Sequence, residues 1–412
     1  MSKLERTLSF IDIYLFAIGY IIGAGIFILI GKVSKSAKKL SWLSFLLAGI
    51  CALLISTSYI DLTYINKSNF GEAEIIKKVF GKYSTIFYTI LVICIGVFVN
   101  STVALSIGEA ISKYVLLKPA IVATILIVLF AIINSIGMKF TAIYNHASTL
   151  IEIGALLVIV FFGYKQLTKK GSSASVSGSA SNIGFSTLIY TALLAMFAYS
   201  GFEVTIKLTE EAKDPNDIPK AIIASIVTAI GIYILVSVVA TRTMGSVELG
   251  KSSFPMSTLS KKLIGATASI MFLFIGVISI SNTLLVSQMG TARVFHSIGR
   301  DIPKLNWLSY VNKYNKTPSI ATGLVAILSI VALYFKNIEK LAAISSCLIF
   351  LLFVILNAAI FLMYFDKEAK KRLEKSWTHP INNGMPILPA IAFIVSICIL
   401  IVGCYYSMNT AF

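Results

Sequence analysis

Long apolar stretches separated by short polar loops run along the whole chain. About 17 to 25 apolar residues are enough for a helix to cross the hydrocarbon core of a bilayer. Strands of a membrane barrel would alternate apolar and polar positions, and these stretches do not alternate. The pattern therefore predicts an all-α integral membrane protein with about 11 transmembrane helices, at residues 11–30, 41–64, 84–112, 119–138, 147–165, 186–206, 219–244, 263–292, 319–335, 339–364 and 387–407.

The composition agrees with a membrane protein. Of the 412 residues, 57% are hydrophobic and only 13% are charged, whereas a soluble domain carries about 25% charged residues. Soluble enzymes, nucleic-acid-binding proteins and secreted disulfide scaffolds are therefore excluded. The net charge of +17 is spread over short loops, which favours anionic lipid headgroups over nucleic acid as the partner. No small-residue cleavage site follows the N-terminal residues, so we expect the first helix to be retained.

The sequence contains no motif for catalysis or for metal binding. Its five cysteines lie in apolar stretches without metal-ligand spacing, so we expect them to be small core residues. The three histidines are far apart, and His-Glu-x-x-His and Gly-x-Ser-x-Gly motifs are absent. We expect no enzyme activity, no metal and no cofactor.

Two groups of five stretches are separated by a Gly/Ser tract at residues 171–182, which has the composition of a flexible linker. Gly23-Ala24-Gly25 interrupts the first stretch and Ser200-Gly201 interrupts the sixth. Paired interruptions are typical of discontinuous helices in inverted-repeat transporters, although small residues also allow close helix packing. We predict a first repeat at 1–165, an external linker at 166–185, an inverted second repeat at 186–365, and a cytoplasmic loop with the eleventh helix at 366–412.

The interrupted helices predict a site for an α-amino acid. At a helix break, free amides and the positive end of the helix dipole favour a carboxylate. Carbonyls released on the other side of the breaks can accept hydrogen bonds from an ammonium group. The amides are those of Ala24, Gly25 and Ile26, and the carbonyls are those of Ile21, Phe197, Ala198 and Ser200.

Four segments of the chain resemble motifs of one transporter family, the amino acid, polyamine and organocation (APC) permease superfamily. The resemblance covers nearly the whole chain in the right order. It implies a 5+5 inverted-repeat (LeuT-like) core, a cytoplasmic N-terminus and secondary transport of amino acids or related amines. The segments are Gly19-Tyr-Ile-Ile-Gly-Ala-Gly-Ile-Phe27, Asn69-Phe-Gly-Glu72 through Gly81, Phe197-Ala-Tyr-Ser-Gly-Phe-Glu203 with Glu210-Glu211 to Ile222, and Ala292-Arg-Val-Phe295 through Arg300-Asp301 to Pro318.

The orientation depends on this resemblance. Of the 35 Lys and Arg residues, 20 lie in or beside loops on the side of the N-terminus and 15 lie on the other side, which is a weak bias. The chain also departs from the family pattern. Many relatives have twelve helices, and Ile302 stands where glycine is frequent. The loop from Lys113 to Lys118 has no cysteine, so we expect no disulfide-linked glycoprotein partner.

The resemblance also implies roles for individual residues. Gly23, Ala24 and Gly25 would hold the substrate carboxylate, and Phe197 would be an aromatic lid unless it is an ordinary core residue. Ile26, Ala198, Gly201 and Asn282 are further candidates for substrate binding.

Four of the acidic residues within the apolar stretches stand out as functional candidates, because ionisable groups are costly to place in a membrane. We expect Asp12 to cap a helix, and Glu109 to reach the membrane surface or pair with Lys113. Glu203 matches an acidic gate position of the family and serves as a gate or as a structural hydrogen-bond partner. Glu152 lies where some proton-coupled relatives carry a lysine in place of sodium. It could bind a proton or another cation, recognise a cationic substrate, or form a structural hydrogen bond.

Polar residues of the eighth stretch, Ser279, Ser281 and Asn282, either bond between helices or line the substrate or a cation site, as do Asn100 and Ser101 of the third. We predict a plasma-membrane transporter that works by alternating access and is proton-coupled or exchanging, with protons or sodium as the ion. The alternatives are a polyamine or organic-cation transporter, or an amino-acid sensor or channel on the same scaffold.

Overall fold

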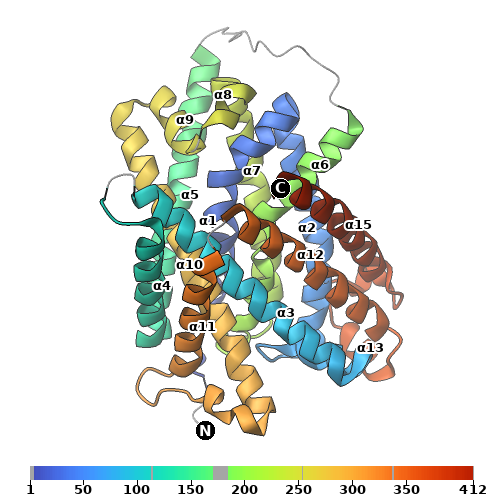
Figure 1. Cartoon of the computed structure of the whole chain (residues 1–412). Helices are drawn as coiled ribbons and strands as arrows, with labels where there is room; N and C mark the ends of the chain where they lie inside the picture. Colours follow the sequence, from blue (N-terminus) through green and yellow to red (C-terminus); the bar gives the residue numbers. More distant parts are fainter. Residues whose placement is uncertain (1–3, 113–114, 170–183, 253, 336–337, 412) are drawn as a thin grey trace.

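The computed structural model describes residues 4–112, 115–169, 184–252, 254–335 and 338–411, and the secondary structure in this part of the chain is helical apart from one isolated β-bridge. Ten of its segments are long and apolar enough to cross a membrane, and α11 is a shorter apolar helix. The helices of these apolar segments are α1 (Phe10–Ala37), α2 (Ser41–Ile65), α3 (Gly71–Ile111), α4 (Pro119–Ile136), α5 (Met138–Lys169), α6 (Phe185–Met196), α7 (Asp217–Met244), α10 (Ala266–Asp301), α11 (Ser319–Ala332), α12 (Ile338–Met363) and α15 (Ile387–Ala411) (Figure 1).

Short helices complete the chain. They are α8 (Ser246–Lys251), α9 (Pro255–Leu263), α13 (Lys367–Leu373) and α14 (His379–Asn382), with the 3₁₀ helices η1 (Lys38–Leu40), η2 (Phe197–Tyr199), η3 (Phe202–Leu208), η4 (Pro303–Ser309) and η5 (Leu333–Phe335). Each of the eleven expected stretches corresponds to a helix, so the all-helical class is confirmed. The Gly/Ser tract at 171–182 lies outside the described residues.

Helix α1 lies at the centre of the molecule, where it contacts α5, α6, α7 and α10. Helix α3 crosses α10 and α12, and α15 packs on α12 and α2. The helices α8 and α9 lie at one end of the bundle, and the N-terminal segment and α13 lie at the other (Figure 1). We call these ends the α9 face and the N-terminal face.

The start of α1 is held by its own sequence. Ser9 and Asp12 form a capping box, in which the Ser9 amide donates to Asp12 Oδ2 at 2.7 Å and the Asp12 amide donates to Ser9 Oγ. His146 Nε2 of α5 lies 3.1 Å from Asp12 Oδ1. The expectation that Asp12 caps a helix is therefore confirmed, and the cap is also tied to α5.

The loop after α12 is fastened to α2 by a buried carboxylate. Asp61 accepts hydrogen bonds from the hydroxyls of Tyr364 at 2.8 Å, Ser376 at 2.6 Å and Thr378. Arg372 donates to the Ile65 carbonyl at 2.7 Å. Because three hydroxyls satisfy the Asp61 carboxylate, it serves as a structural clasp between distant parts of the chain.

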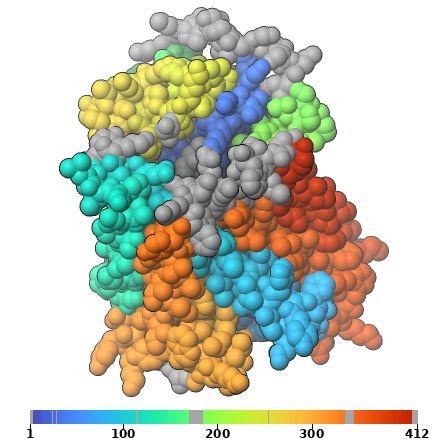
Figure 2. Space-filling view, viewed as in Figure 1, coloured from blue at the N-terminus to red at the C-terminus, as the bar shows by residue number. Residues whose placement is uncertain are grey.

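The outside of the bundle is apolar. Helices α3, α4, α11 and α15 form much of the side seen in Figure 2. Large apolar side chains such as Ile132, Phe161 and Ile401 are more than half exposed, as expected where lipid replaces water. The cysteines were expected in the core, and this was wrong for Cys398, which is exposed, while the other four are half-buried.

Candidate substrate and coupling site

Helix α1 is interrupted at Gly23, as the sequence predicts. Gly23 has φ −16° and ψ −108°, outside the helical region, and Ala24, Gly25 and Ile26 form the first turn after it. Ser279 Oγ of α10 donates to the Gly23 carbonyl at 3.1 Å. A Cβ atom on Gly23 would lie 1.9 Å from Thr283 Oγ1. The close approach of α10 therefore requires glycine at the break.

The sixth span is interrupted as well. Helix α6 ends at Met196, η2 follows, Ser200 is extended, and Gly201 has φ +128° before η3 begins. This φ favours glycine, and a Cβ atom there would lie 1.9 Å from Tyr20 Cδ1. The amide of Gly201 donates to Glu203 Oε2 at 2.7 Å. Glu203 thus stabilises the break from within the same segment.

The two breaks face each other. A Cβ atom on Gly25 would lie 2.9 Å from both Cα and the carbonyl oxygen of Ala198. The Tyr233 hydroxyl of α7 lies 2.7 Å from the Ile21 carbonyl and 3.0 Å from the Ala198 carbonyl, so it bridges the two broken helices. Sequence reasoning missed Tyr233, because it sits in an unbroken apolar helix and nothing local distinguishes it.

Some of the carbonyls expected to bind an amine already accept protein hydrogen bonds. Tyr233 reaches those of Ile21 and Ala198, and Ser200 Oγ donates to the Phe197 carbonyl at 2.6 Å. A carbonyl oxygen has a second lone pair. An ammonium group can therefore bind beside these hydroxyls or take their place.

A polar seam joins α1, α5 and α10 next to the first break. Asn282 Nδ2 donates to Thr149 Oγ1 at 3.2 Å, and Asn145 Nδ2 donates to Asn282 Oδ1 at 3.1 Å. Thr149 Oγ1 in turn donates to the Leu15 carbonyl at 3.3 Å. The side chain of Asn282, a candidate for substrate binding, thus points toward α5. Ser281 also faces α5, where it lies beside Tyr144.

Glu152 lies in this seam and is fully buried. Its carboxylate lies beside Ser279 and Asn282, yet neither oxygen has a hydrogen-bond partner of ordinary geometry. No ion pair with Glu152 is formed among the described residues. An unpaired charge is costly to bury, so this position favours binding of a proton or a cation. Ser279 places the carboxylate one side chain away from the Gly23 carbonyl.

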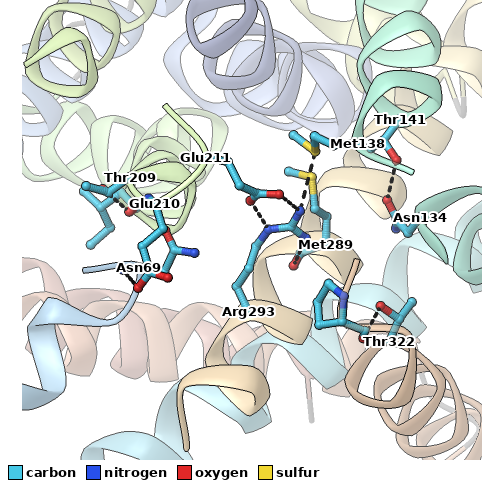
Figure 3. Close-up of polar contacts among 12 residues, drawn as sticks. Asn69, Asn134, Met138, Thr141, Thr209, Glu210, Glu211, Met289, Arg293 and Thr322 are labelled. Atoms are coloured by element: carbon cyan, nitrogen blue, oxygen red, sulfur yellow. Dashed lines mark hydrogen bonds and ion pairs between the residues drawn. The ribbon is translucent and has the colours of Figure 1, made fainter. Parts of the chain in front are cut away.

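Ion pairs close the N-terminal face below the breaks. Arg293 of α10 binds Glu211 through two hydrogen bonds, Nε to Oε2 at 2.6 Å and Nη2 to Oε1 at 2.8 Å, and both side chains are buried (Figure 3). The Glu211 carbonyl accepts the amides of Thr7 and Leu8 at 3.0 Å. We use the name inner latch for the two ion pairs Arg293–Glu211 and Arg300–Glu210. The latch holds the N-terminal segment against α10.

The pair in the outer part of the latch is less buried. Arg300 Nη2 donates to Glu210 Oε1 at 2.6 Å. Glu210 and Asn69 exchange backbone-to-side-chain hydrogen bonds, and Figure 3 shows these two residues side by side. Partial burial raises the pKa of Glu210, but hydrogen bonds from Arg300 and the Asn69 amide lower it more, so this pKa lies below its ordinary value. Stability from a lowered carboxyl pKa is lost only as the pH falls through that pKa. This pair therefore persists at neutral pH.

Removing Arg293 is expected to destabilise the protein strongly. Arg293→Met leaves the Glu211 carboxylate buried without a counter-charge, which costs about 3–5 kcal/mol. The double variant Arg293→Met/Glu211→Gln removes both charges and should recover most of the loss. Arg300→Met is the matched control, because the Arg300–Glu210 pair is 38% and 20% exposed and such pairs contribute about 0–1 kcal/mol. Thermal unfolding in detergent measures all three, and equal losses for Arg293→Met and Arg300→Met would contradict the assignment.

The remaining polar candidates separate into two groups. Ser101 Oγ donates to the Ser329 carbonyl of α11 at 2.8 Å and Asn100 Nδ2 lies 3.4 Å from Ser329 Oγ, so these two bond between helices. Glu109 lines a cavity of about 280 Å³ on the α9 face with Phe27 and Phe272. Its expected partner, Lys113, lies outside the described residues.

Comparison with known proteins identifies the family of the chain. The model of the amino acid permease family matches residues 8–411. The chain belongs to the amino acid permease family. It is therefore a multi-pass membrane protein of the APC superfamily that transports amino acids, and it is a permease and not an enzyme.

The permease is similar to several characterised transporters. It is 23% identical to the branched-chain amino acid permease BcaP of Bacillus subtilis, with 95% of this chain and 87% of that protein covered. It is 24% identical to the serine/threonine exchanger SteT of the same organism, with 94% and 89% covered. It is 25% identical to the chloroplastic cationic amino acid transporter 7 of Arabidopsis thaliana, of which it spans 66% of the length.

Proposed function

We propose that the permease is a secondary active transporter that moves amino acids by alternating access. The observation that supports this most is the direct contact between two broken helices, where Gly25 of α1 meets Ala198 of the sixth span. Amides of residues 24–26 bind the substrate carboxylate at the start of a half-helix. Carbonyls of Ile21, Phe197, Ala198 and Ser200 bind the amine.

The two halves of the chain form the working parts of this cycle. Residues 1–165 and 186–365 are two five-helix repeats inserted in opposite directions, as the family resemblance implies. The N-terminal face lies on the cytoplasmic side of a plasma membrane. The inner latch therefore closes the substrate path toward the cytoplasm. The cavity beside Glu109 lies on the opposite, external side, and substrate enters there.

The transporter is coupled to protons through Glu152. The carboxylate is buried, lacks a hydrogen-bond partner and lies beside Ser279, which binds the Gly23 carbonyl. Loading a proton removes the charge and allows α1 and α10 to stay packed. Losing it leaves a charge in the seam, which favours a different packing of the same helices. The names of the relatives, which include permeases and an exchanger, are compatible with proton symport and with exchange.

One experiment tests this function. Purified permease in proteoliposomes is given radiolabelled leucine, serine, arginine and the polyamine putrescine, with and without an imposed pH gradient. We expect saturable accumulation of an amino acid above its equilibrium level when the gradient is present. Equilibration without accumulation would indicate a channel, binding without flux would indicate a sensor, and uptake of putrescine alone would indicate a polyamine transporter.

Phe197 is expected to act as the lid over the substrate. It is half-buried and begins η2 at the break. Phe197→Ala removes the ring and should weaken substrate binding at least tenfold, about 1.4 kcal/mol, while Phe197→Tyr keeps most of the ring contact and part of the transport. Uptake kinetics in proteoliposomes measure both. Transport by Phe197→Ala equal to that of the unaltered protein would show that the ring only packs.

A further inference from the structure

A second group of buried charges lies between the sixth-span break and the N-terminal face. It is separate from both Glu152 and the inner latch. Glu203 and Lys207 belong to η3, and Glu72 lies in the first turn of α3. Their exposed fractions are 6%, 6% and 1%. Lys207 interacts electrostatically with both carboxylates, although neither is within 4.0 Å of its ammonium group in an ion pair among the described residues.

Several polar atoms of this cluster have no partner. Both carboxylate oxygens of Glu72 and the hydroxyls of Tyr59 and Tyr88 are buried without a hydrogen bond of ordinary geometry, although the Tyr88 hydroxyl lies beside the Glu72 carboxylate. These two rings lie close enough to Glu72 and Glu203 to interact with them electrostatically. Buried polar groups are nearly always hydrogen-bonded, so these atoms have unused capacity to bind a proton or a water molecule.

A small cavity adjoins the cluster. It measures about 30 Å³ and is lined by Glu203 and Lys207 together with the polar residues Tyr20, Ser287 and Thr291. A water molecule needs roughly 10–15 Å³ of such space and two to four polar partners. The cavity is therefore large enough and polar enough for about two waters, which can connect the ammonium group of Lys207 to the Glu203 carboxylate.

The charges of the cluster do not balance. Two carboxylates and one ammonium group leave one negative charge in a buried setting, where an uncompensated charge is costly. Both arginines of α10 are engaged elsewhere, because Arg293 binds Glu211 and Arg300 binds Glu210. Tyr20, Tyr59 and Tyr88 face the cluster as neutral phenols, and α12 contributes the apolar Ile349 and Leu352 to the cavity wall.

We propose that Glu72, Glu203 and Lys207 form a proton-binding site, distinct from Glu152, that holds one proton. The proton reaches the cavity from bulk water as hydronium, is bound as the O–H of one carboxyl group and leaves a neutral water molecule behind, and it returns to water when the site opens. Because η3 runs directly into the loop that carries Glu210 and Glu211, occupation of this site stabilises the segment that ends in the inner latch. Only this consequence for transport rests on the proposed function.

Infrared difference spectroscopy of the purified permease measures the bound proton without any substrate. Protonated carboxyl groups absorb in their own C=O stretching region, and acid-minus-alkaline spectra report how many are present. Glu72→Gln leaves one ammonium group and one carboxylate, whose charges balance, so we expect the band component of one carboxylic acid to disappear. Lys207→Met leaves two carboxylates, so this component should double. The double variant Glu72→Gln/Lys207→Met leaves one carboxylate and should restore a single component.

Exposed residues supply the controls. Lys77→Met on α3 and Glu374→Gln after α13 remove a charge of the same kind at the surface and should leave the spectrum unchanged. Thermal unfolding identifies any variant that does not fold, and Glu203→Gln then provides a second test, because it too should remove the component. Identical bands in Glu72→Gln, Lys207→Met and the unaltered protein would overturn the proposal. Because the spectra are recorded without substrate, that result would not contradict the proposed transport function. A failure of transport in proteoliposomes would likewise not contradict the spectra.

Discussion

Gly25→Val is expected to abolish substrate binding and transport. Even a single Cβ atom at this position would lie 2.9 Å from Cα and the carbonyl oxygen of Ala198, and 3.0 Å from its Cβ atom. The contacts to Cα and oxygen involve backbone, which cannot turn aside as a flexible side chain can. The two additional methyl groups of valine must therefore push the broken helices apart, separating the amides of α1 from the carbonyls of the sixth span.

The expected loss has two parts that can be measured separately. Overpacking of this kind costs roughly 1–3 kcal/mol of stability, so the variant should still insert and fold, with a lower unfolding temperature. Gly154→Val is the matched control, because a Cβ atom on Gly154 of α5 has no neighbour within 4 Å. Substrate affinity is compared in detergent and uptake is compared in proteoliposomes. Wild-type affinity in Gly25→Val would exclude the contact between the breaks as the binding site.

The helices could be predicted because their lengths depend on a local property, the number of apolar residues needed to cross a bilayer. Their ends were less predictable. Helix α3 begins at Gly71, well before the apolar stretch at 84–112, since its first turns are amphipathic and continue through a kink at Gly81 with φ +85°. The short α11 ends because Leu333–Phe335 turns into a 3₁₀ helix. Hydropathy does not record either feature.

The breaks at Gly23 and Gly201 were also predictable, because glycine within an apolar helix has a local cost. The partners of the breaks were not. Tyr233 bridges them from a regular part of α7, and its role depends on which helix packs against which. For the same reason, the sequence places Asn282 in the site region but does not show that its amide bonds to Asn145 and Thr149.

For the inner latch, too, the sequence indicates the residues but not their partners. Glu210, Glu211, Arg293 and Arg300 all belong to segments that the sequence marks as family motifs, but spacing along the chain does not pair them. The structure pairs Glu211 with Arg293 and Glu210 with Arg300. Lys207 and Glu72 were not predicted to be functional residues. Lys207 lies at the edge of an apolar stretch, and Glu72 lies before the apolar part of α3 begins. Only packing shows that both are buried.

In the proposed function, the position of Glu152 connects ion binding to the substrate site through a short chain of contacts. Its carboxylate lies beside Ser279, and Ser279 Oγ holds the Gly23 carbonyl at the break. A charge on Glu152 must be compensated locally, and the hydroxyl of Ser279 is one of the few donors near it. If that hydroxyl turns toward a charged Glu152, the Gly23 carbonyl loses its hydrogen bond and the break can rearrange. In the proposed cycle, proton loading thereby controls the geometry of the amides at residues 24–26.

Glu152→Gln is accordingly expected to uncouple uptake from a pH gradient. Glutamine resembles the protonated acid and cannot release a proton. One pH unit corresponds to about 1.4 kcal/mol per proton, enough for about tenfold accumulation in the unaltered permease with one proton per substrate, and the variant should show no accumulation. Exchange of internal for external substrate should survive, because it needs no net proton movement. Glu109→Gln, on the external cavity, is the control that should stay coupled. If Glu152→Gln vesicles concentrate substrate as the unaltered protein does, the coupling acid lies elsewhere, and Glu203 is the next to test.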